Sequence, residues 1–178
     1  MVFNADGLLE PRDFVMTLDE IRQSILVRGP SGQETWDSEW RLKLADNLEI
    51  LAKQLWKVGI EKIFVDGSYV EEKAHPNDID GYFECDLLYF ATGKLQQDLN
   101  ALDLNKVWTW DKDSRTVDPN SAKGQLPMWH RYRVELYPHY DQPSGIPDEF
   151  GNNLLFPAAF RKSRKEHKAK GIILLKQN

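Results

Sequence analysis

Residues 61–86 read EKIFVDGSYVEEKAHPNDIDGYFECD, and this stretch decides the fold. It begins with Ile63-Phe64-Val65, a short run of β-branched and aromatic residues that predicts a buried strand. Gly67 and Ser68 follow at the point where that strand should end in a turn. A glycine lets backbone N–H groups approach an anion closely, and a serine adds a hydroxyl donor. The turn is therefore a candidate phosphate site.

Two carboxylates follow the turn. Asp78 stands ten residues after Ser68, and Asp80 comes two residues later. On a strand, side chains two residues apart point to one face, so both carboxylates would lie together while Ile79 points to the other face. Paired carboxylate oxygens near a phosphate turn suit Mg²⁺ better than a softer metal. The stretch therefore predicts a metal-assisted phosphate site.

The combination of Gly-Ser, a spacer and Asp-hydrophobic-Asp resembles the signature of the polymerase-beta-like nucleotidyltransferase superfamily. The resemblance implies an α/β (α+β) fold, with a small mixed β-sheet backed by helices. It also implies that Gly67 and Ser68 hold the phosphates of an NTP and that Asp78 and Asp80 ligate two Mg²⁺ ions. Nearly the whole chain is also similar to an uncharacterised prokaryotic family classed as nucleotidyltransferase-like.

Two residues depart from the superfamily pattern. Asp66 stands before the glycine where a hydrophobic residue is usual, and it adds a negative charge beside the expected triphosphate site. Gly81 follows the acidic pair where another apolar strand residue is expected.

A third carboxylate is expected on a neighbouring strand, where it would hold the catalytic metal and take the proton of the attacking hydroxyl. Residues 131–137 alternate between polar and apolar side chains, which predicts a half-buried strand with a charged outer face. Glu135 lies in its middle and is the candidate, although the superfamily more often has Asp there. The alternative is a solvent-facing Glu135 paired with Arg133 or Lys106.

The C-terminal tail, residues 161–178, is basic although the chain as a whole is acidic. Its cationic residues before Gly171 are Arg161, Lys162, Arg164, Lys165, Lys168 and Lys170. Arg161 and Arg164 are candidate nucleotide-binding residues because a guanidinium can contact a phosphate through two hydrogen bonds. The tail would otherwise bind RNA or a partner protein, or it is only a solvated helix face followed by a docking segment, residues 172–175.

The remaining pattern predicts a single domain over residues 1–178. Residues 1–36 read as an irregular arm with one short helix, and residues 37–58 as a long core-facing helix. Residues 87–90 look buried, 91–102 are compatible with a helix, and 109–127 form a polar loop. No targeting segment or membrane span is apparent.

Composition limits the classes of function. A formal net charge of −5 argues against a general, charge-driven nucleic-acid binder. The single cysteine, Cys85, excludes an internal disulfide and fits the reducing cytoplasm. The position of Cys85 beside a strand favours a buried structural thiol over a nucleophile.

These features favour an Mg²⁺-dependent enzyme that moves a nucleoside monophosphate from an NTP to a hydroxyl acceptor. The acceptor, whether protein, RNA or small molecule, stays open. The alternative is a catalytically inactive binding or regulatory protein with the same fold, such as half of a toxin–antitoxin or phage-defence pair.

Overall fold

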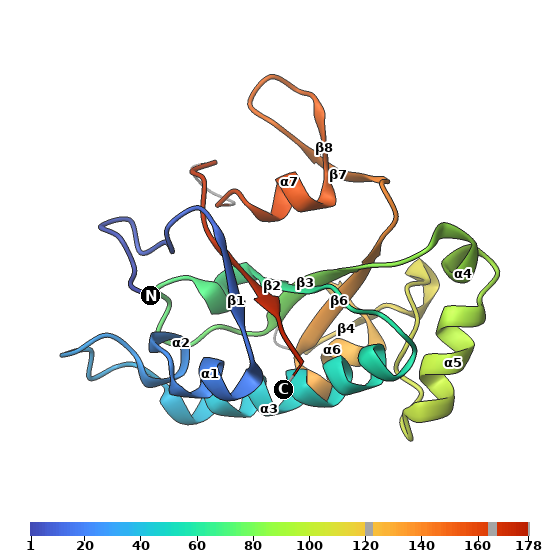
Figure 1. The fold of residues 1–178 in the computed structure, drawn as a ribbon, viewed down its shortest axis with the longest axis horizontal. Helices are drawn as coiled ribbons and strands as arrows, with labels where there is room; N and C mark the ends of the chain where they lie inside the picture. The colour runs from blue at the N-terminus through green and yellow to red at the C-terminus, as the bar shows by residue number, and fades with distance from the viewer. Residues whose placement is uncertain (120–122, 164–166, 178) are drawn as a thin grey trace.

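A computed structural model describes residues 1–119, 123–163 and 167–177. Its centre is a five-stranded mixed sheet with the strand order β1-β9-β2-β3-β6 (Figure 1). β1 is parallel to β9 and β3 is parallel to β6, whereas β2 is antiparallel to both of its neighbours. The α+β class and the small mixed sheet expected from the sequence are confirmed. The strands are β1 (Asp13–Met16), β9 (Ile172–Leu175), β2 (Ile63–Asp66), β3 (Ile79–Glu84) and β6 (Val134–His139).

One face of the sheet is covered by α1 (Leu18–Gln23), α2 (Ile25–Arg28) and α3 (Ser38–Lys57) (Figure 1). The long helix predicted over residues 37–58 is confirmed as α3. Its N-cap is Asp37, whose carboxylate accepts the backbone N–H of Trp40 at 2.9 Å. The leucines at helical spacing are fully buried against the sheet, namely Leu44, Leu48, Leu51 and Leu55.

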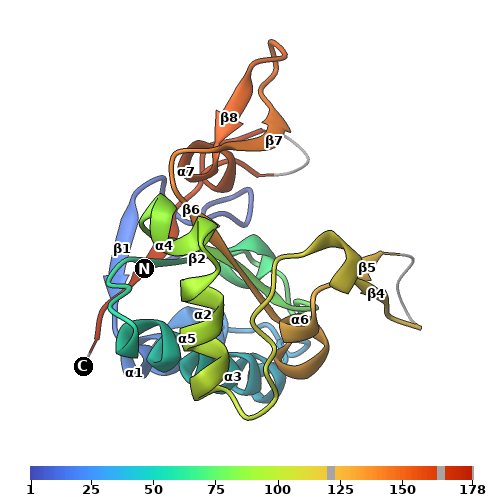
Figure 2. The ribbon, with the colours of Figure 1, turned by 90° about the vertical axis from the view of Figure 1, so that its right-hand side faces the viewer.

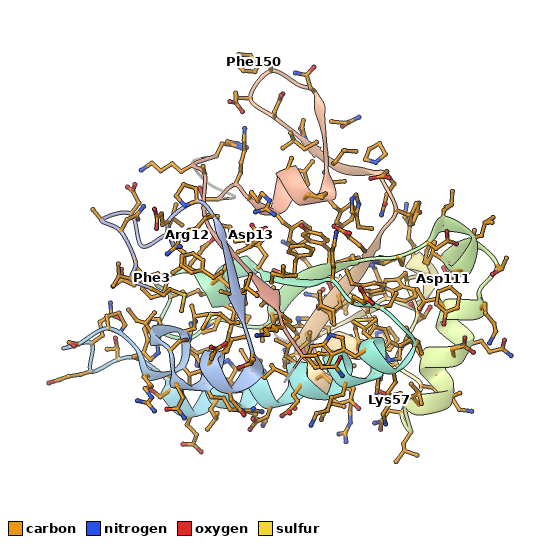
Figure 3. The ribbon with its side chains drawn as sticks, in the orientation of Figure 1. Phe3, Arg12, Asp13, Lys57, Asp111 and Phe150 are labelled. Carbon is orange, nitrogen blue, oxygen red and sulfur yellow. The ribbon has the colours of Figure 1, made fainter. Side chains whose placement is uncertain are left out.

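The opposite face of the sheet carries a smaller apolar cluster. It joins Phe64, Tyr82 and Ile172 to α7 (Phe156–Phe160). The hairpin of β7 (Pro143–Pro147) and β8 (Asn153–Leu155) stands beyond α7, away from the helical face (Figure 1). Phe150 lies at the tip of this hairpin and is 83% exposed (Figure 3).

The two ends of the chain are more regular than the sequence indicates. The N-terminal arm contains an edge strand, β1, and two short helices instead of one. Ser24 separates α1 from α2, because it caps the end of the first and accepts the N–H of Leu26 at 3.1 Å to begin the second. Residues 172–175, expected as a docking segment, form β9 between β1 and β2.

Residues 87–90 were expected to be buried, and this prediction is wrong for Leu87 and Leu88, whereas Tyr89 and Phe90 are half-buried and pack against the core. They lie in α4 (Leu87–Ala91), where Leu87 is 51% and Leu88 is 72% exposed. Gly93 has a φ of 75° and separates α4 from α5 (Lys94–Leu102), so the helix expected over residues 91–102 begins later. The left-handed conformation that Gly93 adopts ends one helix and redirects the chain into the next.

The segment before β6 also differs from the prediction. Arg131 and Tyr132 belong to α6 (Pro127–Tyr132) rather than to a strand, and Arg133 has a φ of 55°. The loop predicted before α6 contains η2 (Lys112–Ser114) and a small hairpin of β4 (Thr116–Val117) and β5 (Gly124–Gln125). Figure 2 shows this hairpin extending from the side of the molecule next to α6.

Candidate functional site

Three carboxylates stand in one row across β2, β3 and β6. Asp66 pairs with Asp80 in the antiparallel register, and Asp80 pairs with Glu135 in the parallel register. Side chains alternate along each strand, so these three lie on the face of Phe64 and Tyr82, opposite α3. The expectation that Glu135 stands on a strand next to the acidic one is confirmed.

The Gly-Ser turn lies directly against this row. It forms the 3₁₀ turn η1 (Gly67–Val70) at the end of β2, and Gly67 has a φ of 72°. A Cβ added at Gly67 would lie 2.5 Å from Oδ2 of Asp80, so the carboxylate packs on the glycine backbone. Ser68 is the next residue and is partly exposed. The structure therefore brings together the predicted phosphate turn and one predicted metal ligand.

A buried arginine of α3 holds this turn. Arg41 is fully buried and donates hydrogen bonds to the backbone carbonyls of Leu26, Tyr69 and Lys73, the last at 2.7 Å. Its guanidinium also lies over the ring of Tyr69, with 4.7 Å between Cζ and the ring centroid. Burial lowers the pKa of Arg41 to about 10. Hydrogen bonds from this buried cation to the carbonyls of Tyr69 and Lys73 therefore fix the end of the turn.

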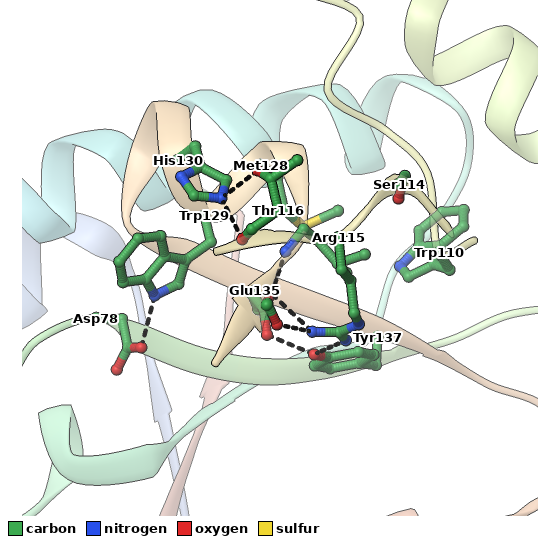
Figure 4. Close-up of polar contacts among 12 residues, drawn as sticks. Asp78, Trp110, Ser114, Arg115, Thr116, Met128, Trp129, His130, Glu135 and Tyr137 are labelled. Atoms are coloured by element: carbon green, nitrogen blue, oxygen red, sulfur yellow. Dashed lines mark hydrogen bonds and ion pairs between the residues drawn. The ribbon is translucent and has the colours of Figure 1, made fainter. Parts of the chain in front are cut away.

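Asp78 precedes β3 rather than lying on it. Its Oδ2 accepts a hydrogen bond from the indole Nε1 of Trp129 at 2.7 Å (Figure 4). Trp129 is buried on α6, and the guanidinium of Arg133 lies 3.8 Å from the centre of one of its rings. The α6 segment therefore orients the first carboxylate of the motif.

Glu135 is buried and its two oxygens are already engaged (Figure 4). Oε1 accepts the backbone N–H of Leu126 at 2.8 Å and lies 3.6 Å from the guanidinium of Arg115. Oε2 accepts a hydrogen bond from the hydroxyl of Tyr137. Burial, with the nearby charge of Glu135, raises the pKa of this hydroxyl, so it stays a donor. The alternative of a solvent-facing Glu135 is wrong.

The unusual Asp66 has a cationic partner. Lys170, which precedes β9, places its Nζ 3.0 Å from Oδ1 of Asp66 and 2.5 Å from Oε1 of Glu71. Burial raises the pKa of Asp66 to about 6, although the charge of Lys170 opposes the shift. The negative charge that the sequence places beside the turn is therefore compensated inside the protein.

Three other cationic residues of the tail, Arg161, Lys162 and Lys168, also contact acids. Arg161 pairs with both oxygens of Asp13, with 3.1 Å between NH2 and Oδ2. The labelled Asp13 lies on β1 (Figure 3). Lys162 pairs with Glu149 at 2.8 Å. Arg164, the second candidate arginine, lies outside the described residues. These contacts join the tail to the body of the protein, and the nucleotide-binding role of Arg161 stays a prediction.

Gly81 is the second residue that departs from the superfamily pattern, and packing explains it. A Cβ at this position would lie 2.3 Å from the carbonyl oxygen of Phe64 and 2.8 Å from Cδ2 of Leu136. Both distances are shorter than any ordinary contact, so only glycine fits between β2 and the Leu136 side chain. The absence of a side chain here lets β3 pair with both β2 and β6 in the observed register.

The residues present fit a metal ion only in part. Among the described residues, no three His, Cys, Asp or Glu side chains are grouped so as to hold a metal ion. Asp78 and Asp80 supply the hard oxygen donors that Mg²⁺ prefers. Glu135 does not fit, because its oxygens accept hydrogen bonds from Leu126 and Tyr137 and face Arg115.

Sequence reasoning missed four residues that shape this site. Lys170 was one member of a charge run, and Arg115 was one polar residue of a loop. The sequence carries no signal for the pairing of these cations with Asp66 and Glu135, because the contacts join segments far apart in the chain. The other two are Trp129 and Tyr137.

The chain belongs to the family of unknown function DUF6932, whose model matches residues 1–176. No curated protein matches the chain, and no solved structure does. Within the described residues, none of the helices has the length and apolar character needed to cross a membrane.

Proposed function

We propose that this protein is an Mg²⁺-dependent nucleotidyltransferase that moves a nucleoside monophosphate from an NTP to a hydroxyl acceptor. The observation that carries the proposal is the contact between Gly67 and Asp80 beside the in-register partner Glu135. It joins a turn suited to phosphate and a carboxylate suited to a cation on one face of the sheet. The single Cys85 agrees with a cytoplasmic location for this activity.

In the proposed reaction, the acceptor oxygen attacks the α-phosphorus of the NTP. The bond from phosphorus to the bridging oxygen breaks, pyrophosphate leaves, and the hydroxyl proton is released to water. Asp78 and Asp80 would hold Mg²⁺, which when bound neutralises charge on the attacking and leaving oxygens. The backbone of Gly67 and the hydroxyl of Ser68 would hold the leaving phosphates. Trp129 keeps Asp78 oriented through its 2.7 Å hydrogen bond.

The test is incubation of the purified protein with each α-³²P-labelled NTP, Mg²⁺ and lysate, followed by separation of labelled macromolecules and small molecules. The wild type should label an acceptor and release pyrophosphate, and Asp78→Asn and Asp80→Asn should do neither. Glu39→Gln, which changes an exposed carboxylate on α3, is the matched control and should retain full activity. Equal labelling by the wild type and both Asn variants would contradict the proposal.

A second candidate is a non-catalytic protein that binds a nucleotide, RNA or a partner protein, for example in a toxin–antitoxin or phage-defence pair. The engagement of Glu135 by Arg115, Leu126 and Tyr137 favours it, because a general base needs an oxygen that can accept the proton. Two results together would favour this candidate over the enzyme. Calorimetry would show that Mg²⁺–NTP binds, and no pyrophosphate would be released with any acceptor tested.

A further inference from the structure

Lys170 contacts both ends of the Gly-Ser turn, η1. Its Nζ lies 3.0 Å from Oδ1 of Asp66, the residue before the turn, and 2.5 Å from Oε1 of Glu71, the residue after it. Nζ also donates to the carbonyl oxygen of Gly67 at 3.4 Å. One ammonium makes all three contacts, and its side chain is only 3% exposed. Lys170 therefore engages the turn from inside the protein.

The backbone around Lys170 is fixed on two sides. The N–H of Lys170 donates to the carbonyl oxygen of Arg161 at 2.9 Å. At the next residue, Gly171, an added Cβ would lie 2.3 Å from the carbonyl oxygen of Glu10, so only glycine lets the chain pass this close to the N-terminal arm. These contacts place the Lys170 side chain against a turn that begins 103 residues earlier in the chain, at Gly67.

The contact with Gly67 sets the direction of the peptide that follows. In a trans peptide, the carbonyl oxygen and the N–H of the next residue point in opposite directions. Because the carbonyl of Gly67 points to Lys170, the N–H of Ser68 points away from it. Ser68 is partly exposed, whereas Lys170 is buried. Lys170 therefore fixes the orientation of the Gly67–Ser68 peptide, which is the centre of the candidate phosphate turn.

We infer that Lys170 is a positioning residue for phosphate, whose ammonium clamps η1 in the backbone conformation that receives a triphosphate. This inference rests on the proposed function and assigns a role in it to one residue of the basic tail. A lysine of the tail could instead contact the triphosphate directly. A direct contact acts through the charge of the ammonium, whereas a clamp acts through the conformation of the turn, so the two can be separated by experiment.

Two measurements on the same variants test the inference. Calorimetry gives the affinity for Mg²⁺–tripolyphosphate, and hydrogen exchange followed by NMR gives the opening of the backbone at residues 67–71. Asp66→Val/Lys170→Met removes the clamp together with one charge of each sign. This double variant should bind tripolyphosphate about tenfold or more weakly, which corresponds to the loss of one hydrogen bond to a charged group. Exchange should become faster in η1 and stay unchanged in α3.

Matched variants accompany the double variant. Lys53→Met removes an exposed ammonium of α3 and should behave as the wild type in both measurements. Glu71→Gln and Glu71→Leu remove the same charge, but only glutamine keeps an oxygen that can accept a hydrogen bond from the ammonium of Lys170. Glu71→Leu should therefore bind tripolyphosphate more weakly than Glu71→Gln, and its turn should exchange faster. This pair decides the question if the double variant does not fold.

The outcomes separate the inference from the proposed function. If the wild type binds tripolyphosphate and the double variant binds it equally well, the inference is overturned and the proposed function stands. Weaker binding with unchanged exchange in η1 would also overturn the inference, because Lys170 would then act on the phosphate through its charge. No binding of tripolyphosphate by the wild type would overturn both.

Discussion

Lys170 and Asp66 form an ion pair whose side chains are only 3% and 8% exposed, with 3.0 Å between Nζ and Oδ1. Asp66 is the last residue of β2 and Lys170 stands just before β9, so the pair joins two neighbouring strands at the carboxylate row. Breaking a buried pair by removing one partner is costly, whereas replacing both partners with apolar residues is often neutral. The pair can therefore be tested as a unit.

Replacement of Lys170 alone should destabilise the protein. We expect Lys170→Met to lower the free energy of unfolding by about 3–5 kcal/mol, because Asp66 is left buried without its cation. The double variant Asp66→Val/Lys170→Met should recover most of that loss. Urea unfolding followed by tryptophan fluorescence measures both values. A double variant as unstable as the single one would show that Lys170 acts instead through Glu71 or through the carbonyl oxygen of Gly67, which lies 3.4 Å from Nζ.

Arg41 should be as important for stability, for a different reason. Arg41→Met would leave buried carbonyl oxygens of Leu26 and Tyr69 without their donor, and each such loss costs about 1–3 kcal/mol. The matched control is Arg12→Met, because Arg12 is 60% exposed and pairs with the exposed Glu10. Exposed pairs contribute about 0–1 kcal/mol. Equal unfolding free energies for the two variants would rule out Arg41 as the support of the turn.

Gly81 should tolerate no side chain. A Cβ there would meet the carbonyl oxygen of Phe64 at 2.3 Å, and both strands would have to shift. Overpacking of this kind costs about 1–3 kcal/mol and occasionally more. Gly32→Ala is the comparison, since Gly32 has a φ of 83° but no atom within 4 Å of an added Cβ, so only backbone strain contributes. That strain costs roughly 1–2 kcal/mol. Thermal unfolding of both variants should give Gly81→Ala the lower melting temperature.

The sequence predicted the parts of the site whose signals are local. A β-branched run before a glycine defines β2 and η1, and alternation around Glu135 places that residue on a strand. The alternation of polar and apolar side chains was misleading at Arg131 and Tyr132. One polar residue followed by one apolar residue fits a turn of helix as well as a strand. Pro127 was the better signal, because proline is favoured in the first turn of a helix and it opens α6.

The contacts that set the chemistry of the site could not be predicted. β1 is a strand of four residues whose only strand partner in the described sheet is β9, near the other end of the chain. In the folded sheet, Arg115 contacts Glu135 and Lys170 contacts Asp66. A pattern of charge along the chain does not specify such pairs, since it gives no distance between side chains far apart in sequence.

Cys85 offers a pH-dependent test of the folded structure. Burial, with the adjacent charge of Asp86, raises the pKa of this thiol from 9.0 to about 11. Because the thiolate is the form that reacts, alkylation of the native protein by iodoacetamide should be slow near neutral pH. The rate should rise about tenfold per pH unit until it levels off near the raised pKa.

The chain contains a single cysteine, so mass spectrometry of the labelled protein measures the extent of alkylation at Cys85 alone. In urea, the thiol should return to an ordinary pKa of about 8.5, and labelling at pH 8 should be faster by roughly two orders of magnitude.

The raised pKa also means that the thiol of the folded protein holds its proton more tightly than the thiol of the unfolded protein. The stability contributed by this thiol is therefore full below the unfolded pKa of about 8.5 and is lost as the pH rises through about 11. Asp86→Asn should speed native labelling, because it removes a charge that raises the pKa. A native rate that equals the rate in urea and levels off near pH 8.5 would contradict the half-buried position of Cys85 just after β3.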